Sequence, residues 1–142
     1  MTMPDKKSPN LFAQFRHHAL NRPDASAVHY YADNRWQTLQ YKNLLLHSIW
    51  VYHFLKANDI QPQDRVALIM DNSALWPILF FGIQARGAIV LPLHPQNHPE
   101  ENIAFLLHAE AKAVILSESN TRLQQILQEH NIHCHTFSSL EN

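Results

Sequence analysis

Glycine is scarce in this 142-residue chain, which has two where an average chain of this length carries about ten. Gly82 and Gly87 lie five positions apart, and neither a Lys-Ser nor a Lys-Thr pair follows them. The dinucleotide-binding fingerprint and the phosphate-binding P-loop both need a different glycine spacing. The sequence therefore excludes a glycine-built phosphate loop within these residues.

The sequence also contains little cysteine and no apolar run long enough to span a membrane. Cys134 is the one cysteine, so no disulfide can form within the chain. Residues 1–10 contain no apolar run of the kind found in signal sequences, and we therefore expect a cytoplasmic protein. The longest apolar run, residues 74–83, is half the length of about 20 residues that a membrane span needs. We expect no transmembrane segment and place this run in the core.

Charge of either sign is balanced, with eleven Lys plus Arg against twelve Asp plus Glu and a net charge of −1. The basic residues are scattered along the chain, which argues against a nucleic-acid partner. The eleven histidines are the unusual feature, because imidazoles titrate near pH 6.5. If several histidines are held neutral in the interior, stability should fall between about pH 7 and 5, because the unfolded chain binds more protons there.

The apolar pattern predicts alternating strands and helices. The predicted helices are 11–21, 41–57, 74–86, one beginning at Pro99, and 121–130, and the predicted strands are 27–32, 35–39, 66–70, 88–93, 113–116 and 132–137. Asp33-Asn34 joins the first two strands as a β-hairpin. The later alternation predicts an α/β fold, an open and mostly parallel sheet with flanking helices, because parallel neighbours need a helical crossover.

Turn and cap residues refine this prediction. Strands 66–70, 88–93 and 113–116 are continuous apolar runs, which predicts burial on both faces of each strand. Asn72-Ser73 is expected to cap the start of helix 74–86, and Gly87 to form its left-handed C-terminal cap.

Residues 64–95, DRVALIMDNSALWPILFFGIQARGAIVLPLHP, resemble the N-terminal part of adenylate-forming acyl-CoA synthetases, the AMP-binding synthetase/ligase family. The landmarks that match are Asp64-Arg65-Val66-Ala67, Asn72-Ser73, Trp76, Gly82-Ile83, Gly87-Ala88 and Pro92-Leu93-x-Pro95. Upstream, Leu39-Gln40-Tyr41-Lys42-Asn43-Leu44 is similar to the family's Leu-Thr/Ser-Tyr-x-Glu-Leu motif. The resemblance extends over about residues 11–137.

Several positions depart from that family pattern. Gln40 and Asn43 replace two residues that have the spacing of a capping box, so we expect a looser start of helix 41–57, capped by Thr38 instead. Other departures are Arg86 where the family usually has Ala, His94 for Asn, and Gln63 where a turn Gly is common.

The resemblance implies the N-terminal subdomain of the acyl-CoA synthetase-like fold, with a disordered start at 1–10, the α/β subdomain at 11–137 and a frayed end at 138–142. Whole enzymes of this kind, such as long- or medium-chain fatty acyl-CoA ligases, join a carboxylate to ATP and then pass the acyl group to CoA or another thiol. Their phosphate loop, adenine-binding motif, ribose-binding Asp and catalytic Lys lie further along the chain.

The resemblance therefore implies the scaffold part of an ATP-dependent ligase that is inactive alone. ATP, Mg²⁺ and CoA belong to the parent enzyme, and no catalytic, cofactor-binding or metal-binding residue is expected here. The expected partner is the C-terminal part of the parent, and an apolar surface that this part would cover predicts self-association. The alternative is a free-standing, non-catalytic interaction module, and the reading frame after Asn142 would separate the two. The acyl substrate and the acceptor thiol stay open.

Two segments carry residue types that could do chemistry. His130-x-x-His133-Cys134-His135 contains zinc ligand types, but alternate strand residues point to opposite faces, so we expect a half-exposed strand. Cys134 could be a nucleophile beside these histidines, but a small core residue is the favoured interpretation. The loop His94–Glu101 follows a strand and offers acid-base groups, yet its Pro99-Glu100-Glu101 start favours a purely structural strand-to-helix connection.

Aromatic residues recur at core spacing on two predicted helices. We interpret them as packing residues, not as a base-stacking or acyl pocket. They are Trp50, Tyr52, Phe54, Trp76, Phe80 and Phe81.

Overall fold

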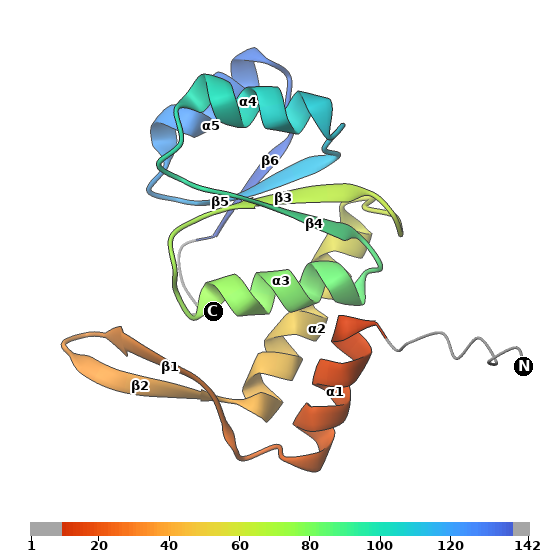
Figure 1. Ribbon diagram of the computed structural model, residues 1–142, viewed down its shortest axis with the longest axis vertical. Coiled ribbons are helices and arrows are strands. Elements are labelled where there is room, and N and C mark those ends of the chain that lie inside the picture. The colour runs from red at the N-terminus through yellow and green to blue at the C-terminus, as the bar shows by residue number, and fades with distance from the viewer. Residues whose placement is uncertain (1–9, 138–142) are drawn as a thin grey trace, which may run out of the picture.

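The computed structural model describes residues 10–137, which form a four-stranded sheet between two layers of helices and a separate hairpin (Figure 1). The elements are α1 (Leu11–Asn21), β1 (Ser26–Ala32), β2 (Arg35–Gln40), α2 (Tyr41–Ala57), β3 (Arg65–Ile69), α3 (Leu75–Ala85), β4 (Ile89–Leu93), α4 (Pro99–His108), β5 (Ala113–Ser117), α5 (Thr121–Glu129) and β6 (Cys134–Phe137). None of the helices within 10–137 is long and apolar enough to cross a bilayer.

The predicted chain ends are only partly testable. Residues 1–9 and the predicted frayed end at 138–142 lie outside the described residues. Asn10 belongs to the fold, because its side-chain oxygen accepts the Ala13 backbone N–H at 2.8 Å and caps the start of α1.

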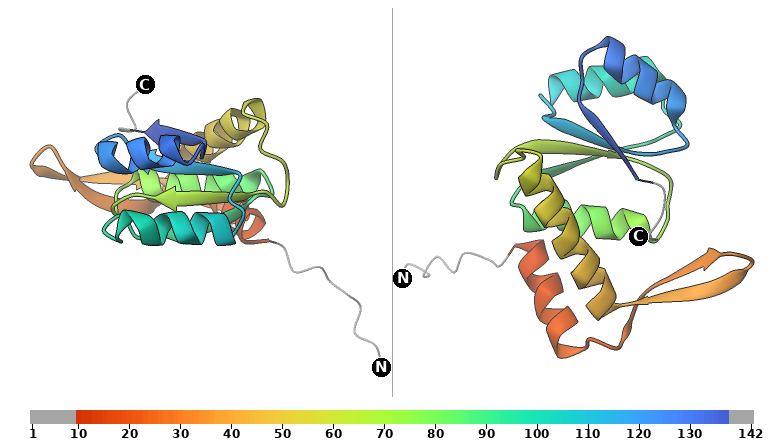
Figure 2. Two further views of the ribbon diagram at one scale, coloured as in Figure 1. Left: turned by 90° about the horizontal axis from the view of Figure 1, so that it is seen from above. Right: turned by 180° about the vertical axis from the view of Figure 1, so that it is seen from behind.

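The four strands are all parallel and lie in the order β4-β3-β5-β6, which confirms the predicted α/β fold. Helices α2 and α3 cover one face and α4 and α5 the other, with α1 packed outside α2 and α3 (Figure 2). Side chains along β3 point alternately to the two helix layers. Val66 and Leu68 face α2 and α3, whereas Ala67 and Ile69 face α4 and α5.

Burial differs between the strands in a way that the apolar runs did not reveal. The inner strands β3 and β5 are buried, as predicted. The prediction that 88–93 is buried on both faces was wrong, because β4 is an edge strand and Ile89 is 44% exposed. An edge position also suits Pro92, which has no N–H to donate to a further strand.

Helices α2 and α3 cross in close contact at Gly82. A Cβ atom at Gly82 would lie 2.4 Å from both Cβ and Cγ1 of Val51 and 3.0 Å from the Ser48 carbonyl oxygen. Val51, Ile78 and Ile83 are almost fully buried around this crossing. The glycine is therefore needed for packing at the centre of the larger core.

The helices that lead into strands share one C-terminal motif. Gly87 has φ +77°, as predicted for a left-handed cap, and the next N–H, that of Ala88, donates to the Ile83 carbonyl at 3.2 Å. The Gly87 N–H itself donates to the Gln84 carbonyl at 3.0 Å, which gives a pair of hydrogen bonds. The equivalent pair ends α2, α4 and α5, where the left-handed residues are Asp59, Glu110 and Asn131. One glycine and three polar residues thus perform the same task.

Two predicted helix caps were wrong. Thr38 does not cap α2, because its hydroxyl lies 3.0 Å from Nδ1 of His29 across the hairpin. The first free N–H groups of α2 donate instead to the backbone carbonyls of Pro23 and Ala25, each at 3.0 Å. The predicted Asn72-Ser73 cap makes no side-chain bond to α3, which begins after Ala74.

Two departures from the family pattern have clear structural roles. Arg86 holds the α2–β3 connection against the end of α3, since its Nε donates to the Ile60 carbonyl at 2.7 Å and its Nη2 to Oε1 of Gln61 at 3.1 Å. Gln63 takes the left-handed conformation that a turn glycine would take, with φ +72°.

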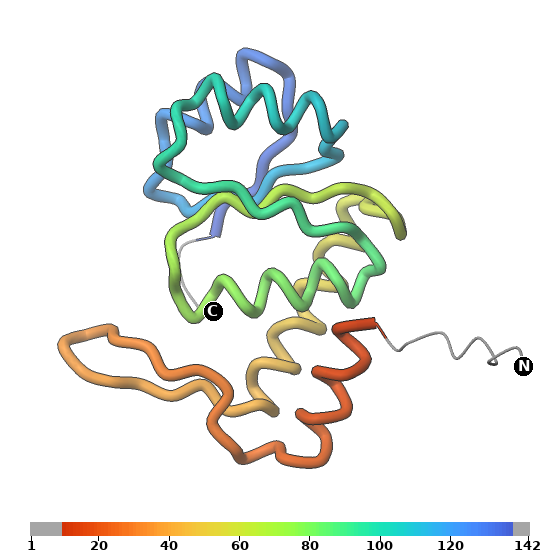
Figure 3. The backbone as a smooth tube through the Cα atoms, in the orientation of Figure 1, coloured from red at the N-terminus to blue at the C-terminus, as the bar shows by residue number. Residues whose placement is uncertain are grey.

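The β1–β2 hairpin projects from the helical layer and does not join the main sheet (Figure 3). Asp33 and Asn34 turn it with φ values of +52° and +58°, which confirms the predicted two-residue turn. Tyr31 and Trp36 stand on the hairpin as an exposed edge-to-face pair with ring centroids 5.6 Å apart.

Candidate functional site

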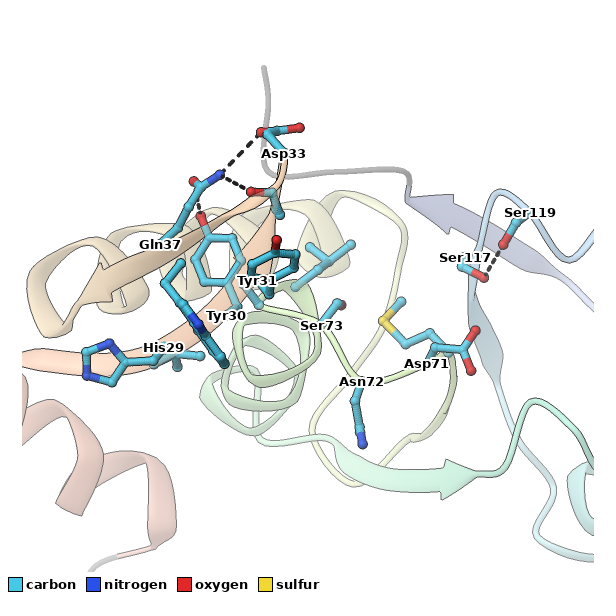
Figure 4. Close-up of a pocket in the computed structure, with 16 residues that line it drawn as sticks. His29, Tyr30, Tyr31, Asp33, Gln37, Asp71, Asn72, Ser73, Ser117 and Ser119 are labelled. Atoms are coloured by element: carbon cyan, nitrogen blue, oxygen red, sulfur yellow. Dashed lines mark hydrogen bonds between the residues drawn. The ribbon is translucent and has the colours of Figure 1, made fainter.

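An open groove lies between the hairpin and the carboxyl edge of the sheet (Figure 4). It measures about 880 Å³ and is lined by residues from β1, β2, the loop after β3 and the end of β5. In open α/β sheets the carboxyl ends of the strands are the usual place for ligands. We call this surface the carboxyl-edge groove.

The sheet side of the groove is polar. Parallel strands end at the same edge, so Asp71, Asn72 and Ser73 after β3 line the same groove as Ser117 at the end of β5 and Ser119 after it (Figure 4). The two serine hydroxyls are 3.1 Å apart. Within residues 10–137, the side chains of Asp71, Asn72 and Ser73 have no hydrogen-bond partner and are exposed.

The hairpin side of the groove is held together by its own hydrogen bonds. The Tyr30 hydroxyl donates to Oε1 of Gln37 at 3.1 Å. The Gln37 amide in turn donates to the Ala32 carbonyl and to Oδ2 of Asp33, each at 3.2 Å. These bonds fix the shape of the wall and occupy most of its polar groups.

Electrostatically the groove is weakly acidic. Its lining contains Asp33, Asp71 and His29, and neither Lys nor Arg is among the described residues that form it. Such a surface can hydrogen-bond a neutral polar partner but lacks the cations that a phosphate chain requires. The sequence analysis missed this groove, although Asp71-Asn72-Ser73 directly after a buried strand was an available signal.

The loop His94–Glu101 connects β4 to α4 and contains the first turn of α4. Asn102, which is buried, holds it by donating to the His94 carbonyl at 3.2 Å and accepting from the Asn97 amide at 3.1 Å. Nδ1 of His94 accepts the Gln96 backbone N–H at 3.1 Å. These three hydrogen bonds fix the course of the loop between His94 and Asn102.

The acidic groups of this loop support the start of α4. The Glu101 carboxylate accepts the His98 backbone N–H at 3.3 Å, and Pro99 occupies the first helical position. Glu100 forms an ion pair with His98. A backbone hydrogen bond, aided by the His98 charge, lowers the pKa of Glu100, so this carboxyl is a poor general acid near neutral pH.

The histidines near β6 separate as the strand pattern predicted. The rings of His133 and His135 lie on one face with centroids 4.5 Å apart, whereas Cys134 packs on the other face against the α4 and α5 layer. His130 ends α5. Within 10–137, no three His, Cys, Asp or Glu side chains are grouped so that they could hold a metal ion.

Burial shifts the pKa of both Cys134 and His135. It raises the pKa of the Cys134 thiol, which disfavours the nucleophilic thiolate, and the residue is half-buried in apolar surroundings as the core interpretation requires. Burial, with a smaller contribution from His133, lowers the pKa of His135, whose ring packs edge-on against Phe54 with centroids 5.0 Å apart.

Most histidines lie at the surface, which contradicts the idea that several are held in the interior. Nine of the eleven are exposed, and the other two, His47 and His135, are half-buried. The premise of the expected pH dependence, several histidines in the interior, is therefore not met.

The aromatic residues behave as predicted except at one position. Phe81 stacks on Phe15 with centroids 4.0 Å apart, and Trp76 stacks on Phe80 at 5.1 Å. Trp50 stacks on Phe54 at 5.8 Å but is 54% exposed, so its assignment to the core was wrong.

Comparison with known proteins gives a consistent picture. The pattern of a protein family described as AMP-binding enzyme matches residues 15–140. Bacitracin synthase 3 of Bacillus licheniformis is 34% identical over 114 residues, which are 80% of this chain and 2% of the synthase. The fold matches a fatty acyl-adenylate ligase from L. pneumophila with a TM-score of 0.80 at 20% identity, over 92% of this chain and 24% of the ligase.

A third similar protein is a benzoate CoA ligase from Burkholderia xenovorans LB400. Its structure matches with a TM-score of 0.78 at 21% identity, over 93% of this chain and 26% of that protein. The chain thus spans about a quarter of these ligases and a far smaller part of the synthase.

Proposed function

Because this chain belongs to the AMP-binding enzyme family, we propose that it is the N-terminal scaffold part of an ATP-dependent acyl-activating ligase. The whole enzyme would join a carboxylate to ATP, giving an acyl-adenylate and pyrophosphate, and then form a thioester with CoA. The partner of this scaffold would be the remaining part of that enzyme. The family match over residues 15–140 is the observation that supports this proposal.

The family is broader than the acyl-CoA synthetases that the sequence resembles. The similar proteins include bacitracin synthase 3 and a fatty acyl-adenylate ligase as well as a benzoate CoA ligase. Adenylate formation is the chemistry common to this family. CoA as the acceptor, and a fatty acid as the substrate, rest on the resemblance of residues 64–95 and belong to the proposal.

The residues described here do not suit ATP or Mg²⁺ by themselves. Attack on a triphosphate needs preorganised cations at the developing charge, and the carboxyl-edge groove presents Asp33 and Asp71 with neither Lys nor Arg in its described lining. We derive no catalytic step from this groove. The proposal is that residues 10–137 supply the scaffold and that the catalytic groups come from elsewhere in the enzyme.

A pyrophosphate-release assay tests the inactivity. The chain is incubated with ATP, Mg²⁺ and either a fatty acid or a mixture of amino acids, with a complete acyl-CoA ligase as the positive control. We expect release no faster than in the blank without protein. Turnover that rises with protein concentration and survives repeated purification would contradict the proposal.

A further inference from the structure

The outward face of α2 carries apolar side chains where a surface helix usually has polar ones. Outward residues recur at helical spacing along one stripe, and we call this stripe the α2 face. It consists of Lys42, Leu46, Ile49, Trp50, His53 and Lys56. Leu46 is 63% exposed, although the opposite side of α2 packs against α1 and α3. An apolar stripe exposed on a surface marks an interaction site.

The charge of α2 has one sign. None of its 17 residues is Asp or Glu, and Lys42 and Lys56 stand near its two ends. Lys42 is bound to Asp24, with Nζ 2.6 Å from Oδ1. Lys56 makes no ion pair with the residues described and is exposed. The α2 face therefore suits a partner that is apolar at its centre and acidic at one end.

Helix α4, on the other side of the sheet, has this complementary character (Figure 1). Its exposed residues are Glu100, Glu101, Ala104, Phe105, Leu107 and His108, which we call the α4 face. Phe105 is 50% and Leu107 59% exposed. Two carboxylates occupy the first turn, and α4 contains neither Lys nor Arg.

We propose that the α2 face of one copy of this chain packs against the α4 face of a second copy. In an antiparallel pair, Lys56 near the end of α2 lies beside the carboxylates at the start of α4. Trp50 precedes Lys56 by six residues and Leu107 follows Glu101 by six, each about 9 Å along its helix at a rise of 1.5 Å per residue. Leu107 is therefore level with Trp50 when the charged ends pair.

Pairing of α2 with α2 of another copy is less favourable. In an antiparallel α2–α2 pair, each Lys56 would lie beside the partner's Lys42, whose charge Asp24 already offsets, and neither helix has a carboxylate with which Lys56 could pair. Charge thus selects α4, and not α2, as the surface that covers the α2 face.

The two faces belong to opposite sides of the sheet, so the contact is head-to-tail, and the assembly has a free α2 face at one end and a free α4 face at the other. One helix pair buries less than the roughly 800 Å² per partner of a standard stable interface. Association is therefore weak, depends on concentration and decreases with added salt.

Two variants, each lacking one face, test this arrangement by sedimentation velocity up to the solubility limit. Wild-type protein should show species larger than the monomer, whereas Trp50→Glu and Phe105→Glu should each be monomeric at the same concentration. Their equimolar mixture should form a dimer with one copy of each variant and nothing larger, because each supplies the face that the other lacks. Trp36→Glu, which changes a tryptophan that is 74% exposed on the hairpin, is the matched control and should associate like wild type.

A charge exchange provides a second test that preserves the apolar residues. Lys56→Glu should weaken association, and adding Glu100→Lys to the same chain should restore it. A wild-type chain that stays monomeric over the whole range would overturn the proposal. So would association of Phe105→Glu equal to wild type, or a mixture of the two face variants that stays monomeric although circular dichroism shows both to be folded.

Discussion

Replacing Gly82 by Ala tests whether the α2–α3 crossing is as close as the structure shows. The new Cβ would lie 2.4 Å from two carbon atoms of Val51, whereas carbon atoms normally pack at about 3.5–4.0 Å. Val51 is buried and β-branched, so its side chain cannot turn aside within the helix. Relieving the overlap must move the two helices apart, and overpacking of this kind costs about 1–3 kcal/mol.

Helix propensity acts in the opposite direction. Glycine inside a helix is about 1 kcal/mol less favourable than alanine, so without a close contact Gly82→Ala would stabilise the protein. Combining the two effects, we expect a net loss of up to about 2 kcal/mol in the free energy of unfolding. The sign of the change therefore distinguishes a close crossing from a loose one.

Urea unfolding followed by circular dichroism, at a concentration where the protein is monomeric, measures this change. Ala104→Gly on the exposed side of α4 is the control for propensity and should cost about 1 kcal/mol. Val51→Ala removes Cγ1, one of the two clashing atoms, so its combination with Gly82→Ala should cost less than the sum of the two single changes. A Gly82→Ala protein more stable than wild type, with an unchanged dependence on urea, would refute the reasoning.

Three further predictions concern single residues. Gln63→Gly should stabilise the protein by up to about 1 kcal/mol in urea unfolding, because φ +72° strains a residue with a Cβ; a loss of stability would argue against this strain. Arg86→Ala should cost about 1–2 kcal/mol in the same assay by removing the bond to the Ile60 carbonyl, and a neutral result would mean that water replaces it. His135 has a folded-state pKa below its ordinary value of 6.5, so its contribution is present above that pH and is lost as the pH falls through the folded pKa. Thermal unfolding of His135→Phe should accordingly depend less on pH between about 7 and 5 than wild type, and equal slopes would contradict this.

The features that could be predicted from the sequence are those determined by residues close together in the chain. The hairpin turn at Asp33-Asn34, the inner strands β3 and β5 and the cap at Gly87 follow from local backbone preference and apolar runs. The exposure of β4 could not be predicted, because an apolar run does not reveal which strand lies at the edge. Glu110 gave no signal either, since glutamate rarely takes a left-handed conformation.

The same distinction applies to the candidate site. Asp71-Asn72-Ser73 could be placed at the carboxyl edge of the sheet from the order of strand and turn. The opposite wall comes from the hairpin, about forty residues earlier, and no local pattern indicates that Tyr30 and Gln37 lie across from these residues. The exposure of Trp50 was missed for a similar reason, because helical spacing alone does not show which face of α2 is covered.

Because α2, α3, α4 and α5 end in the same motif, the two edges of the sheet differ in how well they tolerate insertions. Each of these helices ends at the amino edge of the sheet with the same pair of hydrogen bonds. The second bond is made by the backbone N–H of a residue that is at least partly buried, such as Ile60 or Ile132. An insertion there would break a local motif and shift the strand that follows. The carboxyl edge has exposed loops such as Asp71–Ser73, which can lengthen without disturbing the register of the strands. We therefore expect loops to change in length during evolution at the carboxyl edge, where they can create new binding specificity. The helix ends at the amino edge preserve the fold.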